Sequence, residues 1–231
     1  MLRVEDIHTY YGDSYVLQGI SMEVGEAAVI GLLGRNGMGK TTFIRSVVGS
    51  IRPRRGRMFF KGEEITHKRS FEISRMGISL VPQGRQVFPS LNVTENLTVV
   101  ARRESGGWTL EKVFEFFPPL RDRARHPGNR LSGGEQQMLA IGRSLMTNPS
   151  LLLMDEPTEG LSPLFVQTVG QIIRRLQESG IAILLVEQDV MIAFELASRG
   201  IVLESGRVVL TGPTRDLATN PTIREAYMGL A

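Results

Sequence analysis

The chain has 231 residues, of which 42% are hydrophobic, which suffices for one α/β domain with insertions or for two small lobes. Its net charge of +3 is too small to indicate nucleic-acid binding, and the absence of cysteine excludes disulfides and thiol chemistry. Met1 is followed by no apolar leader, and runs such as 181–186 are too short to cross a bilayer. We therefore expect a soluble chain that associates with a membrane only through a partner.

The N-terminal residues predict a β layer. Leu2, Val4 and Ile7 suggest a strand with a period of two, residues 10–13 a turn, and residues 15–24 a second strand. An antiparallel arrangement therefore precedes the buried strand that follows. Tyr11 lies in the predicted turn, where an aromatic ring could stack on a nucleotide base, although packing is the commoner role for a tyrosine.

A glycine-rich loop follows the apolar run 28–33, which predicts a buried strand, and precedes a predicted helix over 41–48. The loop consists of Gly34, Arg35, Asn36, Gly37, Met38, Gly39, Lys40, Thr41 and Thr42. A strand, a glycine loop, Lys-Thr and a helix in this order are typical of a phosphate-binding loop. Lys40 is expected to contact the β- and γ-phosphates, and the Thr41 hydroxyl to ligate Mg²⁺. The alternative is a glycine-rich turn that carries a lysine by chance.

Gln83 follows the next predicted strand of the core, residues 78–81, which Pro82 ends. A strand at 57–62 and a helix at 70–76 precede it. Its side chain is expected at the carboxyl edge of the sheet, where open α/β sheets bind their ligands.

Residues 84–146 change in character and predict helices at 94–103 and 109–117, followed by an arginine-rich loop to Arg130. The run Leu131-Ser132-Gly133-Gly134-Glu135-Gln136-Gln137 then leads into an apolar stretch, 138–146. Ser132 and Glu135 have the spacing of a capping box. Two consecutive glycines weaken a helix start unless its backbone must approach something closely, so a second anion-binding helix N-terminus is the functional interpretation.

Two adjacent carboxylates, Asp155 and Glu156, end the apolar strand predicted at 151–154. Acids in such a place are costly unless they meet a metal or take part in proton chemistry. Asp155 suits Mg²⁺ held through its water shell, and Glu156 suits the polarisation of a water molecule.

The remaining residues alternate helix and strand. We predict a helix from Pro163 to about Glu178, a strand over 181–186, a helix over 190–197, a hairpin over 201–210 and short helices over 214–218 and 222–228. Gln188 follows the strand 181–186. It is interpreted as a neutral hydrogen-bond donor to the γ-phosphate or attacking water, with helix capping as the alternative.

Together, residues 34–41, Gln83, residues 131–137 and residues 151–156 resemble the P-loop, Q-loop, signature motif and Walker B of ABC-transporter ATP-binding subunits. Their order and spacing agree over essentially the whole chain, and LSGGEQQ is the most specific of them. The runs LVPQGRQVFPSLNVTENL, DEPTEGLSP and LLVEQ resemble the branch that serves importers of branched-chain amino acids, urea and short amides.

The resemblance implies an α/β fold: a RecA-like P-loop NTPase core with a mainly parallel sheet, an N-terminal antiparallel β layer and an inserted α-helical subdomain. Residues 1–231 would form one ATPase domain, with its core in 1–83 and 147–231 and its helical subdomain in 84–146.

The resemblance also implies the site. ATP and Mg²⁺ would lie between two subunits arranged head to tail, with Tyr11 and Val16 at the base. Mg²⁺ would be ligated through Thr41, Gln83 and Asp155, and Glu156, Lys40, Gln83 and Gln188 would act in hydrolysis. Leu131, Ser132, Gly133, Gly134 and Glu135 would act on the ATP of the partner. Gln188 stands where most members carry a histidine, and the loop 159–162 ends in serine where many end in aspartate.

The partners that the resemblance implies are a second, identical or related ATP-binding subunit, transmembrane permease subunits and, indirectly, a substrate-binding protein, with no nucleic acid. The chain would lie at the cytoplasmic face of the membrane, with residues 84–93, including exposed Phe88 and Leu91, near the docking groove.

Three alternatives were weighed. A GTPase or small-molecule kinase does not explain LSGGEQQ, and the guanine-reading Asn-Lys-x-Asp motif is missing from the sequence. ABC ATPases that act on DNA or ribosomes usually carry a long coiled-coil insertion or two ATPase units in one chain. An exporter ATPase of similar size stays open.

Overall fold

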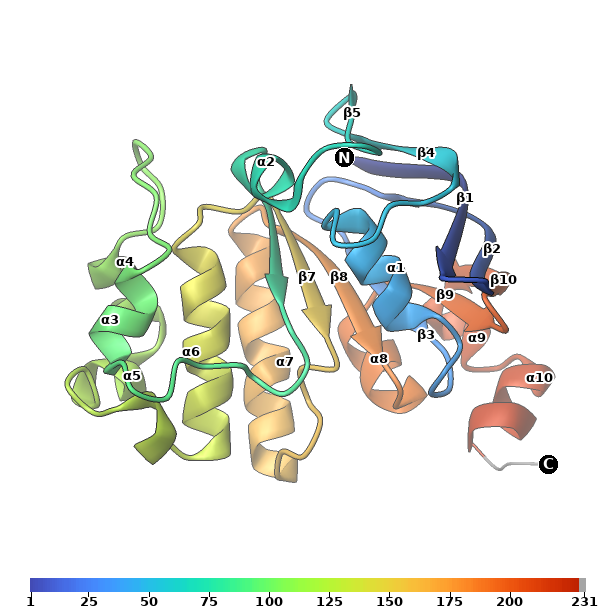
Figure 1. Cartoon of the computed structure of the whole chain (residues 1–231). Helices are drawn as coiled ribbons and strands as arrows, with labels where there is room; N and C mark the ends of the chain where they lie inside the picture. Colours follow the sequence, from blue (N-terminus) through green and yellow to red (C-terminus); the bar gives the residue numbers. More distant parts are fainter. Residues whose placement is uncertain (229–231) are drawn as a thin grey trace.

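The computed structural model describes residues 1–228 and arranges their strands in two sheets (Figure 1). The smaller sheet is antiparallel, with strand order β2-β1-β4-β5. The larger sheet has order β10-β9-β3-β8-β7-β6, and its strands are parallel except for β10. The strands are β1 (Leu2–Tyr11), β2 (Ser14–Val24), β3 (Val29–Leu33), β4 (Arg55–Phe60), β5 (Glu63–Glu64), β6 (Ile78–Val81), β7 (Leu151–Asp155), β8 (Ala182–Glu187), β9 (Arg199–Glu204) and β10 (Arg207–Pro213).

The antiparallel β layer confirms the expected N-terminal fold and corrects one turn. Leu2 and Val4 face the core, and a register shift then turns Ile7 inward at Asp6, whose φ is 47°. An extra residue of this kind is a β-bulge. The turn predicted at 10–13 is wrong in its first half, because β1 continues through Tyr11 and pairs it with Ser14.

The first helix, α1 (Lys40–Val47), packs between the two sheets (Figure 1). Phe43 and Ile44 share one buried cluster with Leu2 of β1 and Leu32 of β3. β3, β7 and β8 are buried along their whole length, as parallel strands with both faces covered should be. The P-loop NTPase core expected from the sequence is confirmed.

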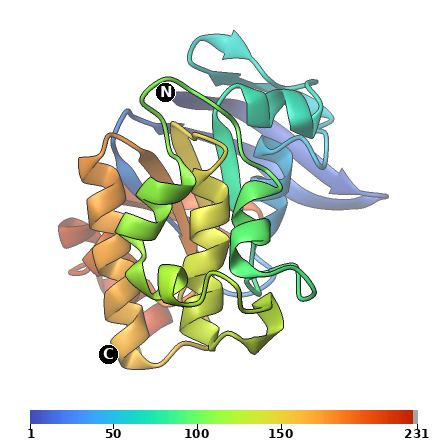
Figure 2. The same ribbon diagram turned by 90° about the vertical axis from the view of Figure 1, so that its left-hand side faces the viewer.

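Helices cover the other face of the larger sheet, and Figure 2 shows them from the side. The helices of the described chain are α1, α2 (Ser70–Arg75), α3 (Val93–Thr98), α4 (Leu110–Phe116), α5 (Pro118–Asp122), η1 (Gly128–Arg130), α6 (Gly133–Leu145), α7 (Pro163–Glu178), α8 (Val190–Leu196), α9 (Thr214–Leu217), α10 (Pro221–Ile223) and η2 (Arg224–Met228). None of these helices is both long enough and apolar enough to cross a membrane.

Two predictions between β6 and β7 were inaccurate. α3 ends at Thr98 rather than 103, because the chain turns so that the Arg102 N–H donates to Met146 O at the end of α6. Part of the predicted arginine-rich loop is helical, since Pro118 ends one helix and begins α5, where a missing N–H costs nothing. α6 starts at Gly133 with Ser132 as its N-cap, as the capping-box spacing predicted, so the glycine pair lies inside its first turn.

The functional motifs meet one edge of the larger sheet. β6, β7, β8, β3 and β9 run parallel, so their carboxyl ends lie along the lower edge in Figure 1. α6 leads up into the amino end of β7, which places its own N-terminus at that same lower edge.

Candidate functional site

The phosphate loop joins the carboxyl end of β3 to α1. Gly39 is the N-cap of α1 with a φ of 103°, a conformation that residues with a side chain rarely adopt. A Cβ at this position would also lie 2.9 Å from Leu17 Cδ2 of β2. The first turn of α1 therefore brings its free N–H groups to the carboxyl edge of the sheet, where an anion is favoured.

Lys40 is buried against this loop, with 4% of its surface exposed. Its Nζ donates hydrogen bonds to Gly34 O at 2.6 Å and to Arg35 O at 3.2 Å. The same atom lies 3.5 Å from Glu156 Oε1. A cation is thus held beside a carboxylate at the phosphate loop.

A cavity of about 270 Å³ lies over the loop. It is lined by Val16, Arg35, Asn36, Gly37, Gly39, Lys40, Thr41, Thr42, Gln83 and Glu156, all of which belong to the predicted set. Gly34 and Met38, which were also predicted to bind nucleotide, do not line this cavity. A Cβ on Gly34 would come within 2.6 Å of Leu203 O, and Met38 Sδ accepts the Ser205 N–H.

Asp155 ends β7 with 4% of its surface exposed. Burial, helped by the neighbouring Glu156 charge, raises the pKa of Asp155 to about 6, although a hydrogen bond from Thr41 and the Lys40 charge act the other way. Among the described residues its Oδ1 finds no hydrogen-bond partner. A buried carboxylate oxygen in this state is costly, and Mg²⁺, a hard cation that prefers oxygen ligands, would satisfy it. Asp155 and Thr41 therefore fit such a cation.

The Glu156 carboxylate lies between the Lys40 ammonium and the Gln83 amide. Gln83 Nε2 donates to Glu156 Oε2 at 3.1 Å and to Glu159 Oε2 at 3.0 Å. Glu156 has a φ of 48°, and its N–H donates to Val186 O of β8 at 2.9 Å. This backbone contact, with Lys40 on the other side, aims the carboxylate at the cavity, where such a group can accept a proton from water.

Gln188 lines a neighbouring cavity of about 740 Å³, which Glu156 and Glu159 also line. Asp189, and not Gln188, is the N-cap of α8, because its Oδ1 accepts the N–H groups of Met191 and Ile192. The capping alternative for Gln188 is therefore wrong. Its contact with phosphate or water stays a prediction.

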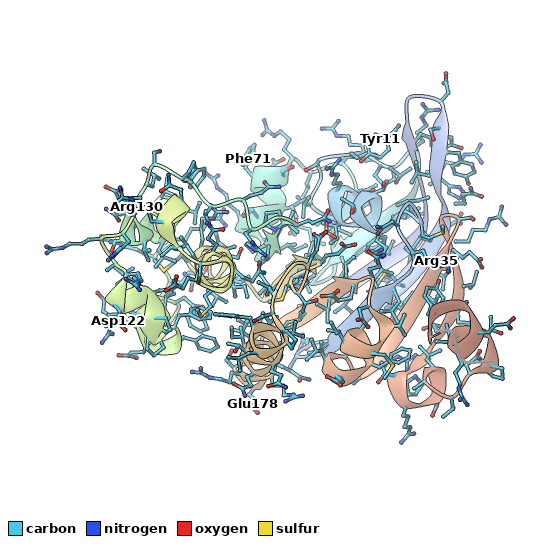
Figure 3. The ribbon with its side chains drawn as sticks, turned by 90° about the horizontal axis from the view of Figure 1, so that it is seen from below. Tyr11, Arg35, Phe71, Asp122, Arg130 and Glu178 are labelled. Atoms are coloured by element: carbon cyan, nitrogen blue, oxygen red, sulfur yellow. The ribbon has the colours of Figure 1, made fainter. Side chains whose placement is uncertain are left out.

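Tyr11 ends β1 and does not line the cavity over the phosphate loop. It is 42% exposed, and its hydroxyl accepts a hydrogen bond from Arg45 of α1 at 3.1 Å. Figure 3 places it on the same half of the molecule as Arg35 of the phosphate loop. Its role in stacking on a base stays a prediction.

The predicted capping box forms at the start of α6. Ser132 Oγ accepts the Glu135 N–H at 3.3 Å, and Glu135 Oε2 accepts the Ser132 N–H at 2.8 Å. Ser132 is exposed, whereas Leu131 is buried below it. A hydroxyl and free N–H groups are therefore available at the carboxyl edge of the sheet.

The phosphate loop and the start of α6 stand apart. Figure 3 views the carboxyl edge, with Arg130 on the side of the helical segment and Arg35 on the opposite side. The cavity over the loop takes its lining from β2, the loop, Gln83 and Glu156, and not from α6. One chain therefore presents two separate helix N-termini on one face.

Packing within this chain explains why position 134, the second of the two glycines, carries no side chain. A Cβ on Gly134 would lie 2.0 Å from Phe165 Cε1 of α7, so the ring occupies the space that a side chain would need. Gly133 instead faces the Arg85 guanidinium, 3.0 Å from the corresponding Cβ position. The sequence had suggested that both glycines serve approach to an anion, and the structure adds a packing role for Gly134.

Gly134→Ala is expected to lower stability more than Gly133→Ala. An alanine must displace a packed aromatic ring at position 134 but only a flexible side chain at 133. Overpacking typically costs about 1–3 kcal/mol, and each kcal/mol lowers the melting temperature by about 2–4 °C at this chain length. Thermal unfolding of both variants without nucleotide measures the difference. Equal melting temperatures would contradict the packing role.

Two contact networks at the site were not predicted. Glu187 ends β8 with 3% of its surface exposed, and its Oε1 accepts the Thr158 hydroxyl at 2.8 Å and the Thr158 N–H at 3.3 Å. Burial raises the pKa of Glu187 to about 7. Arg85 contacts the loop after Glu156 as well as α6. The only sequence signal for the Glu187 network was a carboxylate directly after the apolar run 181–186. No feature of the sequence indicated the contacts of Arg85.

Comparison with known proteins agrees with this geometry. The profile of the family described as ABC transporter matches residues 17–159. The chain is 41% identical to the high-affinity branched-chain amino acid transport ATP-binding protein BraG of Pseudomonas aeruginosa, over 99% of this chain and 100% of that protein. It is 32% identical to the lipopolysaccharide export system ATP-binding protein LptB of Acidithiobacillus ferridurans, over 99% of this chain and 97% of that protein.

Solved structures show the same fold. A nucleotide-free ATP-binding cassette from an ABC transporter superposes with a TM-score of 0.88 at 28% identity, and 98% of each chain is covered. A dimeric structure of a bacterial ABC transporter cassette gives a TM-score of 0.80 at 25% identity, over 93% of this chain and 99% of the other.

Proposed function

The chain belongs to the ABC transporter family, whose ATP-binding cassettes are ATPases coupled to transport, and we propose that it powers an importer of branched-chain amino acids. The main support is the cavity over the phosphate loop, where Lys40, Gln83 and Glu156 meet. A cation for phosphate and a carboxylate for water then lie on one cavity, as hydrolysis of a phosphoanhydride requires.

In the proposed reaction the loop N–H groups and Lys40 bind the β- and γ-phosphates, and Glu156 takes a proton from the attacking water. Gln83 orients the Glu156 carboxylate through the hydrogen bond that it already donates. Gln188 adds a neutral donor from the adjoining cavity, and Tyr11 with Val16 holds the base. Thr41, Asp155 and Gln83 would hold Mg²⁺, which would neutralise charge on the phosphates.

A second chain completes the site. The start of α6 stands away from the phosphate loop of its own chain, so Ser132 and the N–H groups of its first turn are free to meet the nucleotide of a partner. Cassettes of this family form dimers and work with permease subunits. We propose that this chain pairs head to tail with a copy of itself or a related subunit.

The domain organisation follows from the same proposal. Residues 1–83 and 147–231 form the nucleotide-binding core, and residues 84–146 form a helical subdomain that carries the signature motif. Phe88 is exposed and Leu91 half-buried on the segment after Gln83, near the proposed groove for a permease subunit. That permease would hold the chain at the cytoplasmic face of the membrane.

The substrate proposal rests on the higher identity to the branched-chain amino acid protein, 41% against 32% for the export protein. A urea or short-amide importer is the alternative that sequence resemblance leaves open, and export is the next.

Transport by the reconstituted complex tests the proposal. The chain, its permease subunits and a binding protein are placed in proteoliposomes with ATP on the side of this chain. Leucine-loaded binding protein is expected to stimulate ATP hydrolysis and leucine uptake, whereas urea is not. Stimulation by urea alone would favour the other importer, and substrate movement away from this chain would favour an exporter. No stimulation by either substrate would contradict an importer role.

A further inference from the structure

The segment after Gln83 connects the catalytic residues to the start of α6. Gly84, Arg85 and Gln86 all have positive φ, of 74°, 65° and 40°. Side chains disfavour this conformation, so two consecutive residues other than glycine keep it only where surrounding contacts hold them. The contacts that hold this segment are therefore informative.

Arg85 makes part of these contacts, on two sides, and Arg143 of α6 makes another by donating to Gln86 O at 2.7 Å. Its guanidinium donates to Glu159 O at 3.2 Å and Gly160 O at 3.3 Å, in the loop after Glu156. Its other nitrogen faces Gly133, where a Cβ would come within 3.0 Å. Arg85 is thus hydrogen-bonded to the loop that follows the catalytic strand β7 and lies beside the first turn of the signature helix α6.

The place of this guanidinium is not explained by the stability of α6. A positive charge beside a helix N-terminus opposes the helix dipole, and the favourable residue there is an acid, such as Glu135. The two carbonyl groups hold Arg85 in this position in spite of the dipole. Both hydrogen bonds come from Nη2, so this end of the guanidinium is held between the two carbonyl groups.

We propose that Arg85 is a positioning residue that sets the first turn of α6 relative to the loop 156–160, so that Ser132 and its neighbouring N–H groups meet the nucleotide of the partner. The proposal rests on the head-to-tail dimer proposed above. Its consequence is that loss of Arg85 impairs closure on the partner without weakening nucleotide binding to the phosphate loop of the same chain.

Arg102 provides a matched control at the other end of α6. It also ties the segment between β6 and β7 to the core, since its guanidinium donates to Ser74 O at 2.6 Å and to Ser74 Oγ at 3.1 Å. Its N–H donates to Met146 O, at the C-terminal end of α6. Arg102→Ala therefore removes a similar contact far from the signature motif.

The first experiment measures ATP-driven dimerisation by light scattering in a Glu156→Gln background, which slows hydrolysis. Arg85→Ala is expected to raise the ATP concentration at half-dimerisation by about tenfold, as loss of hydrogen bonds from a charged donor should. Arg85→Lys should fall between, because an ammonium can still donate to both carbonyl groups but has no second nitrogen to face Gly133. Arg102→Ala should match its parent, and ADP affinity should change less than about threefold in every variant, since the lost contacts lie outside the phosphate loop.

If Arg102→Ala raises the ATP concentration at half-dimerisation as much as Arg85→Ala does, the helical segment is loosened in general and the proposal is overturned. A loss of ADP affinity in Arg85→Ala equal to its loss of dimerisation would also overturn it. If the Glu156→Gln chain forms no dimer with ATP, the head-to-tail proposal fails for the isolated chain. Hydrogen exchange then decides on Arg85 alone: its loss should speed exchange of the Glu135 and Gln136 amides but not of Leu145, and unchanged exchange refutes it.

Discussion

Glu156→Gln is expected to lower the ATP turnover number by about two to four orders of magnitude, the usual contribution of a positioned base. The amide keeps the size of the side chain, and its single oxygen can still accept a hydrogen bond from either Lys40 or Gln83. It cannot take the proton of the attacking water. Steady-state phosphate release at saturating Mg-ATP measures the loss, and equilibrium binding of a fluorescent ATP analogue should stay near the wild-type value.

Glu159→Gln is the control for this experiment. Glu159 lies three positions along the chain and accepts a hydrogen bond from the same Gln83 amide at 3.0 Å. Unlike Glu156, it has no ion pair with Lys40 within 4 Å among the described residues. Turnover should change by less than about threefold in this variant, in keeping with a residue outside the reaction. If the two variants show reversed effects, the base is Glu159, and if neither loses activity, no carboxylate of this loop acts as the base.

Sequence patterns predicted those parts of the site that consist of residues close together in the chain. The strand before Gly34, the helix after Lys40 and the capping box of Ser132 and Glu135 are formed by residues within a few positions of each other. The hydrogen bonds of the helix and of the capping box join nearby residues, so sequence spacing was enough to predict them. The strand pairs with the distant strands β8 and β9, and it was predicted from its apolar run alone. The buried strand that ends at Asp155 was predicted for the same reason.

Contacts between distant segments could not be predicted in this way. Phe165 fills the space above Gly134, and Arg85 reaches Gly160, across gaps of many residues that no periodicity reports. Pro118 illustrates a different limit, because a proline that ends one helix is also favourable at the start of the next. Spacing also could not show that the Glu187 carboxylate would be buried against Thr158.

The position of Glu156 depends on both local sequence and contacts between distant segments. Sequence placed a carboxylate after Asp155, but its neighbours Lys40 and Gln83 come from other segments of the chain. We expect that, when phosphate enters the loop, Lys40 exchanges part of its contact with Glu156 for the anion. The Glu156 carboxylate then retains Gln83 as its hydrogen-bond donor and is available to water. Lys40 therefore affects both binding and the readiness of the base.

Lys40→Ala is expected to weaken nucleotide binding by about 10- to 100-fold, because hydrogen bonds to a charged group contribute about 1.5–3 kcal/mol. The lost ammonium is buried and lies next to Glu156, whose negative charge would then face the phosphates alone. The measurement is the rise in melting temperature on adding Mg-ATP at about one hundred times the wild-type dissociation constant. That concentration stabilises the wild type by about 2.7 kcal/mol, or about 5–10 °C at 2–4 °C per kcal/mol. A 100-fold weaker variant should gain about 1 °C by the same relations.

Each variant is compared with its own nucleotide-free melting temperature, since removal of a buried lysine also changes the stability of the unliganded chain. Lys61→Ala is the control, because Lys61 is an exposed residue between β4 and β5 that carries the same charge. It should show the full wild-type shift. A full shift in Lys40→Ala would mean that the loop N–H groups and Mg²⁺ hold the phosphates without this lysine, and a reduced shift in Lys61→Ala would trace the effect to net charge rather than to the loop.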